Sequence, residues 1–270
     1  MVELMENKYY LAIADEVELD HKDNVKKTII GLIILEVMLQ LCYQLYPVLL
    51  SLLSKNCRVI VMAILVTFFV AVAKHFSFTT RVFNKQVKPL DKWLIKITLI
   101  ILVLKVLLDL INVSSVFKLP IHQVVVIGLA ALIAAVCEEF MFRGILFDIF
   151  LLIFRKSKFN IFWTAITSSA LFSLSHLINL THQTLISTLG QIIITFLLGL
   201  IFSYLHIWTN GLTWCIIFHF FQDFSPQLAK SDLGNPHIVG VMIMNVPVII
   251  VMLICIYAFN TRYLKLNNSK

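Results

Sequence analysis

Long apolar stretches alternate with short polar ones along most of the chain. After the polar residues 1–27, apolar side chains fill a series of windows, and Lys, Arg, Asn and Pro gather between them. A membrane-spanning helix needs about 20 mostly apolar residues, so each window predicts one crossing of a bilayer. The predicted spans cover residues 28–50, 58–75, 93–111, 121–151, 160–178, 184–206, 210–224 and 238–259.

The fourth window is too long for one straight crossing. A helix of about 30 residues is roughly 45 Å long, whereas the hydrocarbon core of a bilayer is roughly 30 Å thick. This helix must be tilted, interrupted or extended beyond the bilayer. Because no repeat or linker divides the windows, the sequence predicts one all-α transmembrane bundle of about eight spans over residues 28–260. A cytoplasmic polar segment at 1–27 precedes it, and a short C-terminal tail at 261–270 follows.

The composition agrees with a membrane protein. Of the 270 residues, 60% are hydrophobic and 14% are charged. Soluble domains carry about 25% charged and about 45–50% apolar residues, so a soluble single-core enzyme and a disordered chain are both excluded. The 5 cysteines form no CxxC pair and lie in or beside apolar windows, which is typical of small buried side chains rather than a disulfide framework.

Basic residues are distributed unevenly between the two sides of the predicted bundle. Eight spans place both termini on one side, and most of the 22 Lys and Arg residues fall on that side or in its loops. By the positive-inside rule, this multi-pass protein of the cell membrane has both termini in the cytoplasm. The net charge of +7 then reflects loops beside an anionic membrane surface, and no nucleic-acid partner is expected. The basic residues on the opposite side are Lys55, Arg58, Lys118 and Lys230.

Three spans carry ionisable residues in short patterns. Residues 138–143 read EEFMFR, residues 172–176 read FSLSH, and residues 219–223 read HFFQD. Ionisable groups in hydrocarbon cost several kcal/mol, so they are functional candidates by default. The other ionisable residues within spans have simpler structural explanations. Lys105 and Asp109 can pair on one helix face, and Asp148 lies near water at a span end. Glu36 stands alone in the first span and is either protonated or directed at a neighbouring helix. His206 lies at a segment end, so we expect it at the membrane interface.

The spacing within these patterns predicts which side chains pair with each other. Glu139 and Arg143 are four residues apart, so they share a helix face and can form an ion pair. Glu138 lies about 100° around the helix from Glu139 and is left for another partner. His219 and Asp223 also share a face. The least costly arrangement gathers these groups and His176 around a polar, water-filled cavity inside the bundle.

Such a cavity has the minimum parts for hydrolysing an amide bond. A carboxylate beside an imidazole can activate a water molecule, and a second histidine can donate a hydrogen bond to the developing oxyanion. A zinc site is the alternative, with Glu138, His176 and His219 as ligands, although no HExxH motif is present. Nucleophilic catalysis by Cys137, Ser173 or Ser175 is less convincing, because small Ser residues in spans usually serve helix packing.

The three patterns, in this order and on successive hydrophobic segments, resemble the CPBP family of CAAX proteases and bacteriocin-processing enzymes, also called the Abi family. The family motifs are EExxxR, FxxxH and HxxxN/D, and the similar region covers about residues 120–225. The flanking sequences agree too: Gly-Ile-Leu follows Arg143, and TNGLTW at 209–214 precedes the third motif.

The resemblance implies an intramembrane protease of about eight helices. It implies that Glu138 and His176 activate the water and that His219 and Asp223 form the oxyanion site. Glu139, Arg143 and Phe172 would support these groups. Asp223 stands where many members have Asn, and an ionised Asp cannot donate a hydrogen bond, so Asp223 is either protonated or orients His219 as an acceptor. Both glutamate-dependent and metal-dependent chemistry are attributed to the family.

Three functions compete. The first is an endopeptidase that cleaves a membrane-associated protein or peptide, in bacteriocin processing or self-immunity. The second is a non-catalytic scaffold or bacteriocin-immunity protein with the same fold. The third, a transporter, would show an internal repeat or broken spans at matching positions, and the sequence shows neither. The intact set of costly polar groups favours the enzyme, whose partners would be membrane lipid and the substrate.

One geometric difficulty remains at this level. On straight helices, Glu138 lies about 24 Å from the outer end of its span, and His176 lies about as far from the inner end of its own. The two side chains would then sit at different depths, unless the fourth span extends outside the bilayer or the fifth span tilts or begins later.

Overall fold

The computed structural model describes residues 29–31, 33, 34, 37, 52–76, 80–85, 92–113, 119–229 and 238–268, and these residues form helices and no β-strand. The predicted all-α fold is confirmed. In chain order the elements are α4 (Lys55–Phe76), α5 (Lys92–Val113), α6 (Ile121–Glu139), the π-helix η2 (Phe140–Leu146), α7 (Phe147–Ile153), α8 (Asn160–Ser175), the 3₁₀-helix η3 (His176–Thr181), α9 (Leu185–Thr209), α10 (Thr213–Ala229) and α11 (Ile238–Asn268).

The second to eighth predicted spans each coincide with a described helix, whereas the first, 28–50, lies almost wholly outside the described residues. The last helix continues to Asn268, so most of the predicted tail at 261–270 is the end of α11. By length and composition, five helical segments of the described chain can cross a membrane: Cys57–His75, Ile121–Ile153, Asn160–Thr181, Leu185–Thr209 and Ile238–Leu266.

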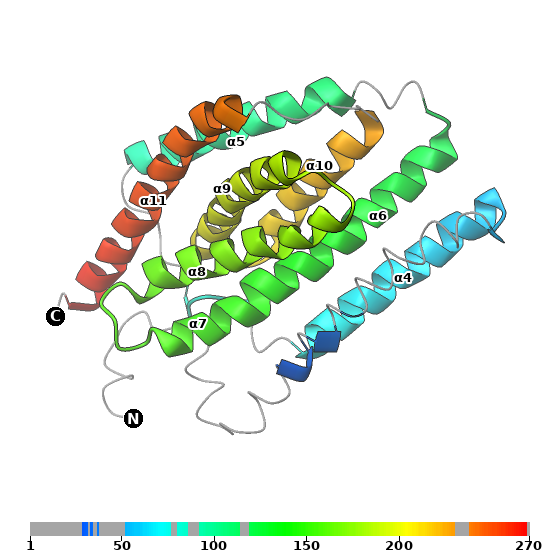
Figure 1. The fold of residues 1–270 in the computed structure, drawn as a ribbon. Coiled ribbons are helices and arrows are strands. Elements are labelled where there is room, and N and C mark those ends of the chain that lie inside the picture. The colour runs from blue at the N-terminus through cyan, green and yellow to red at the C-terminus, as the bar shows by residue number, and fades with distance from the viewer. Residues whose placement is uncertain are drawn as a thin grey trace.

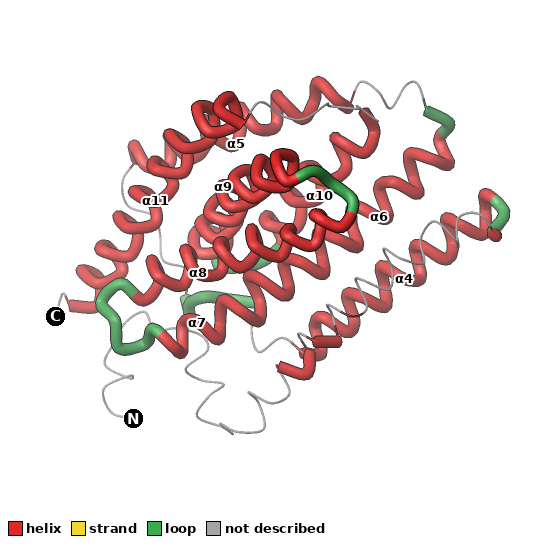
Figure 2. Tube along the Cα trace, in the orientation of Figure 1, coloured by secondary structure: helices red, strands yellow, loops and turns green. Residues whose placement is uncertain are grey.

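Helix α9 lies at the centre of the bundle. It packs against α8, α10 and α11, while α6 lies between α4 and α10, and α5 covers the far side of α10 (Figures 1 and 2). The outward faces remain apolar, since Ile64, Leu104 and Ile243 each keep more than half of their surface exposed. In water such faces would be an aggregation hazard, but in a bilayer they contact lipid.

The fourth predicted span is longer than the hydrocarbon core of a bilayer, and its helical type changes within it. Helices α6, η2 and α7 run without a break over Ile121–Ile153, which is 33 residues. That length corresponds to about 48 Å of helix, so the helix must tilt strongly or extend past a hydrocarbon core of about 30 Å. Extension outside the bilayer is one of the arrangements that would bring Glu138 and His176 to the same depth.

Helices α8 and α9 approach each other through small residues. A Cβ atom placed on Gly199 of α9 would lie only 2.8 Å from Cβ of Ser169 on α8. The Ser169 hydroxyl donates to the Ala165 carbonyl at 2.6 Å and lies 3.3 Å from Oγ of Ser203. Close packing of small residues is a main source of helix association in membranes.

We therefore expect Gly199→Ala to destabilise the bundle by about 1–3 kcal/mol, the usual cost of an overpacked contact. Unfolding of the purified protein in detergent measures the effect. Gly211→Ala is the matched control, because nothing lies within 4 Å of a Cβ at that position. In the Ser169→Gly background, where the clashing Cβ is absent, Gly199→Ala should lower the free energy of unfolding by less than it does in the wild type. Equal stability of Gly199→Ala and Gly211→Ala would contradict this packing.

Asparagine side chains join the loops at one end of the bundle. Asn210 ends α9 in the left-handed conformation, with φ 54° and ψ 42°, and its Oδ1 accepts from the backbone N–H groups of Val82 and Phe83, both at 2.9 Å. Asn260 of α11 accepts from Ile161 N–H at 3.1 Å and donates to the Lys158 carbonyl at 2.9 Å.

These contacts gather three loops and the last turns of α11 at the same end. The Phe83 ring lies 5.3 Å from the ring of Tyr263, which adds the loop at 80–85 to the end of α11. The sequence assigns all these segments to the cytoplasmic side. An even number of predicted spans separates each of them from the next along the chain, so they must lie on the same side of the membrane.

Candidate active site

The helical hydrogen-bonding pattern changes at the EEFMFR sequence. Helix α6 ends at Glu139, the π-helix η2 covers Phe140–Leu146, and α-helical geometry resumes at Phe147. π-Helical turns are rare and frequently occur at functional sites. Here the wider turn carries Arg143 and directly follows both glutamates.

Arg143 and Glu139 form a buried ion pair. Nη1 of Arg143 donates to Oε1 of Glu139 at 2.9 Å, and both side chains are 0% exposed. Nη2 of Arg143 lies 3.3 Å from the carbonyl oxygen of Gly199, to which it donates. The guanidinium carbon lies 4.5 Å from the ring centre of Phe172 and 5.2 Å from that of Phe202, within the range of cation–π interactions. The pair predicted from the four-residue spacing is confirmed.

His219 connects this ion pair to two further carboxylates. Its Nδ1 hydrogen-bonds Oε1 of Glu139 at 2.7 Å, so Glu139 holds both His219 and Arg143. Its Nε2 lies 3.5 Å from Oε2 of Glu138 and 3.7 Å from Oδ2 of Asp223. One imidazole therefore lies between three carboxyl groups, two from the end of α6 and one from its own helix α10.

The cluster has a buried part and a partly exposed part. The side chains of Glu139 and Arg143 are fully enclosed, and that of His219 is 4% exposed. Glu138 and Asp223 are 15% and 31% exposed, respectively. A substrate or water can therefore reach Glu138 and Asp223, which face Nε2 of His219. The buried Glu139 fixes the imidazole through its other nitrogen, Nδ1.

His176 lies at the end of α8, where η3 begins. Its Nδ1 is 2.9 Å from the carbonyl oxygen of Phe172. A carbonyl only accepts, so Nδ1 carries a proton, and when the ring is neutral Nε2 is the acceptor. The Phe172 ring lies between the two histidines, 5.2 Å from His176 and 5.6 Å from His219. Within the described chain no hydrogen bond or ion pair joins His176 to Glu138.

The other chemistries considered from the sequence find less support. Among the described residues, no group of three or more His, Cys, Asp and Glu is arranged to hold a metal ion, and Glu138, His176 and His219 are not such a group. The Ser173 hydroxyl donates to the Ile192 carbonyl at 2.7 Å, and the Ser175 hydroxyl donates to that of Phe172 at 2.8 Å. Both serines bind backbone carbonyls.

Sequence reasoning missed the contribution of α9. Phe202 stacks on His219, with ring centres 5.0 Å apart and an interplanar angle of 21°, and Gly199 offers its carbonyl to Arg143. The Gly199–Ser203 spacing is a readable sign of close helix packing. Phe202, in contrast, is one of 21 phenylalanines and has no distinguishing signal.

Two other polar residues lie in different surroundings from those predicted. The sequence placed His206 at the membrane interface, but the side chain is buried and its ring centre lies 5.2 Å from that of Phe147. Asp148 was expected near water, but it is only 1% exposed. The reason is that α7 packs against α8, so protein rather than water covers that end of the helix.

The central part of the chain is similar to a known protease family. The model of the family described as type II CAAX prenyl endopeptidase Rce1-like matches residues 120–225, which contain all three motifs. No curated protein and no solved structure matches the chain. The resemblance to the CAAX protease family is thereby confirmed over the motif region, and it points to a protease of the membrane.

Proposed function

We propose that the protein is an intramembrane endopeptidase that cleaves a membrane-associated protein or peptide with water activated by Glu138 and His176. The observation that carries the proposal is the position of His219. Its Nδ1 is fixed by the buried Glu139, while its Nε2 faces the more accessible Glu138 and Asp223. The match to the CAAX endopeptidase family supports the general class of enzyme.

The first step is attack by water. The Glu138 carboxylate takes a proton from the water, and the free Nε2 of His176 accepts its other hydrogen, which orients the oxygen. The water oxygen bonds to the carbonyl carbon of the peptide, and the electron pair of the C=O double bond moves to the carbonyl oxygen. A positioned general base typically accelerates such a step by about 10²–10⁴-fold.

In the second step the tetrahedral intermediate is stabilised and then breaks down to the products. His219, held as an imidazolium by Glu139, donates from Nε2 to the oxyanion, with Asp223 beside it. The C–N bond then breaks, and the proton held by Glu138 moves to the leaving amine. The products are a carboxylic acid and an amine, and Glu138 returns to its ionised form.

A biological role in bacteriocin processing or self-immunity is part of the proposal. The alternative is a non-catalytic membrane scaffold or bacteriocin-immunity protein that retains the fold. A scaffold has no need to keep six ionisable groups at the centre of its helices, where each is costly. Five of them are connected, because His219 contacts Glu138, Glu139 and Asp223, and Glu139 in turn binds Arg143, and this connection favours the enzyme.

Cleavage of peptides by the purified protein tests this proposal. Wild type, Glu138→Ala and His176→Ala are incubated in detergent with a quenched-fluorescent library of hydrophobic peptides. We expect a loss of at least about 100-fold in both variants, which is the lower range for a missing general base. Thr261→Ala is the control, since that hydroxyl only donates to the Tyr257 carbonyl within α11.

Two further comparisons separate the alternatives. Resistance of the cleavage to a metal chelator selects glutamate–water chemistry, and loss of cleavage selects a metal ion. Full cleavage by Glu138→Ala would overturn the proposed base. If Glu138→Ala retained full protection or partner binding in cells, the scaffold would replace the protease.

A further inference from the structure

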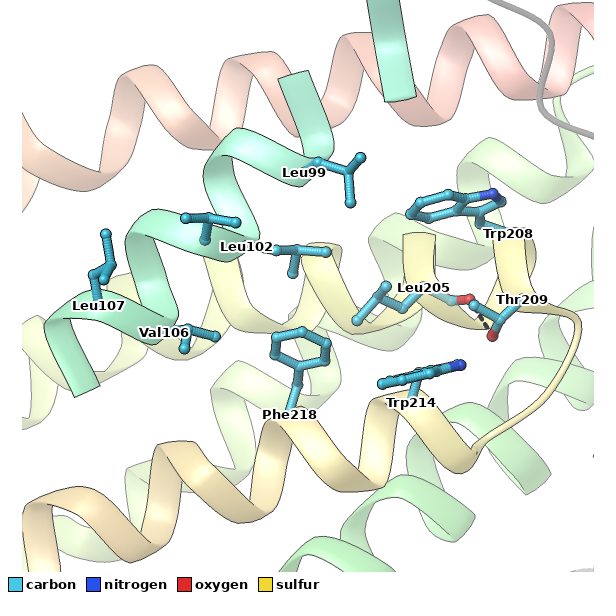
Figure 3. A pocket seen from close by; sticks show the side chains of 10 residues that line it. Leu99, Leu102, Val106, Leu107, Leu205, Trp208, Thr209, Trp214 and Phe218 are labelled. Atoms are coloured by element: carbon cyan, nitrogen blue, oxygen red, sulfur yellow. Dashed lines mark hydrogen bonds between the residues drawn. The ribbon is translucent and has the colours of Figure 1, made fainter. Parts of the chain in front are cut away.

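A large apolar groove lies between α5, α9 and α10. It contains none of the ionisable cluster, which consists of Glu138, Glu139, Arg143, His219 and Asp223. It encloses about 520 Å³, a typical size for a small-molecule site. Figure 3 shows α5 on one side and α9 and α10 on the other, with Phe218 directed between them. The lining residues are Leu99, Leu102, Val103, Val106, Leu107, Leu205, Trp208, Thr209, Trp214 and Phe218.

The groove opens sideways, toward the lipid. Leu99, Val103, Leu107 and Trp214 line it and each keep about half of their surface exposed. The first three follow one face of α5, and the exposed neighbours Ile100 and Leu104 are apolar as well. The eight residue-to-residue steps from Leu99 to Leu107 give the groove a length of about 12 Å along α5.

The two ends of the groove differ in polarity. Trp208, Thr209 and Trp214 gather at the end beside the α9–α10 turn, whereas Val106 and Leu107 mark the purely apolar end (Figure 3). Tryptophan is enriched where a bilayer meets water, because its ring is apolar and its N–H is polar. The tryptophan end of the groove therefore lies at the membrane interface.

A positively charged side chain, that of Lys96, lies near the tryptophan end of the groove. Lys96 is exposed and precedes Leu99 by three residues, so the two are neighbours on the surface of α5. Leu99 is the lining residue of α5 at the Trp208 end (Figure 3). The loop tied to the α9–α10 turn by Asn210 adds two exposed cations, Arg81 and Lys85.

We propose that the groove binds one acyl chain of a bilayer phospholipid, with the lipid phosphate held by Lys96. A hydrocarbon chain matches the apolar length between α5 and Phe218, and a negative headgroup matches the positive charge at the tryptophan end. Because Phe218 directly precedes His219, a chain in the groove fixes α10 against α5 next to the ionisable cluster. This lipid site is independent of the proposed proteolysis.

Tryptophan fluorescence tests the acyl chain. Of the 4 tryptophans, Trp93 and Trp163 are replaced by Phe, so that the signal comes from Trp208 and Trp214. The protein is reconstituted into phosphatidylcholine vesicles with increasing amounts of chain-brominated phosphatidylglycerol, which quenches nearby indoles. We expect quenching to saturate at a mole fraction at least about threefold lower than random contact with the bilayer gives.

Two pairs of variants decide the outcome. Val106→Phe fills the groove and should remove the saturable quenching, whereas Leu104→Phe, on the exposed face of α5 outside the lining, should not. Lys96→Gln should lower the preference for phosphatidylglycerol by up to about fivefold, while Lys265→Gln, which is exposed on α11, leaves it unchanged. Linear quenching that is equal in Val106→Phe and Leu104→Phe would overturn the acyl-chain site. Equal lipid preference in Lys96→Gln and Lys265→Gln would overturn the phosphate contact.

Discussion

Arg143→Met is expected to lower the free energy of unfolding by about 3–5 kcal/mol, the usual cost of removing one partner of a buried ion pair. Arg143 and Glu139 are both fully buried, and 2.9 Å separates Nη1 from Oε1. Methionine fills much of the space between Phe172 and Phe202 but takes the guanidinium away from the buried Glu139 carboxylate, which keeps only its hydrogen bond to His219. Denaturant unfolding of the protein in detergent measures the change.

Two controls separate the lost charge from lost packing. In Glu139→Gln/Arg143→Met the buried carboxylate is gone as well, so stability should return to within about 1–2 kcal/mol of wild type, as for other buried pairs replaced together. Arg155→Met removes an exposed cation at the end of α7 and should change stability by less than about 0.5 kcal/mol. A double variant no more stable than Arg143→Met would show that lost packing, not the unpaired charge, causes the loss.

The helices were predictable because the bilayer sets their length. Each window of about 20 apolar residues had to form a helix whose backbone groups bond internally, and seven of the eight windows coincide with described helices. The 33-residue helix over Ile121–Ile153 followed from the same arithmetic. The π-helix within it was not predictable, since a change from α to π hydrogen bonding has no clear residue signature.

The sequence pointed to most of the ionisable side chains that the structure brings together, but to only some of the contacts between them. The cost of charges in hydrocarbon selected Glu138, Glu139, Arg143, His219 and Asp223, and helix geometry correctly paired Glu139 with Arg143. That Glu139 also holds His219 depends on how α10 packs against α6, a contact between residues 80 positions apart. Hydropathy gives the approximate depth of a residue but not the helix that covers it, which is why His206 and Asp148 were placed near water.

His219→Gln is expected to lower kcat by about 10²–10³-fold and to leave KM nearly unchanged, as when a single oxyanion donor is removed. Glutamine keeps an N–H for Glu139, so the buried side of the cluster stays satisfied. It cannot carry the positive charge proposed for the imidazole beside Glu139, and that charge would strengthen the hydrogen bond only when the oxyanion forms. Steady-state kinetics with the best peptide from the cleavage screen measure both constants.

Variants of Asp223, which lies on the same face of α10, are the matched comparison for His219→Gln. They also show whether Asp223 donates to the oxyanion or orients His219. Its Oδ2 lies 3.7 Å from Nε2 of His219, and it is the most exposed group of the cluster. Asp223→Asn keeps an acceptor and adds an N–H donor for the oxyanion, so we expect kcat within about tenfold of wild type, whereas Asp223→Leu loses about as much as His219→Gln. If Asp223→Asn were as impaired as Asp223→Leu, the ionised carboxylate itself would be required, and Asp223 would act by orienting a charged His219. A rise in KM with kcat unchanged for His219→Gln would place the imidazole in ground-state binding instead of oxyanion stabilisation.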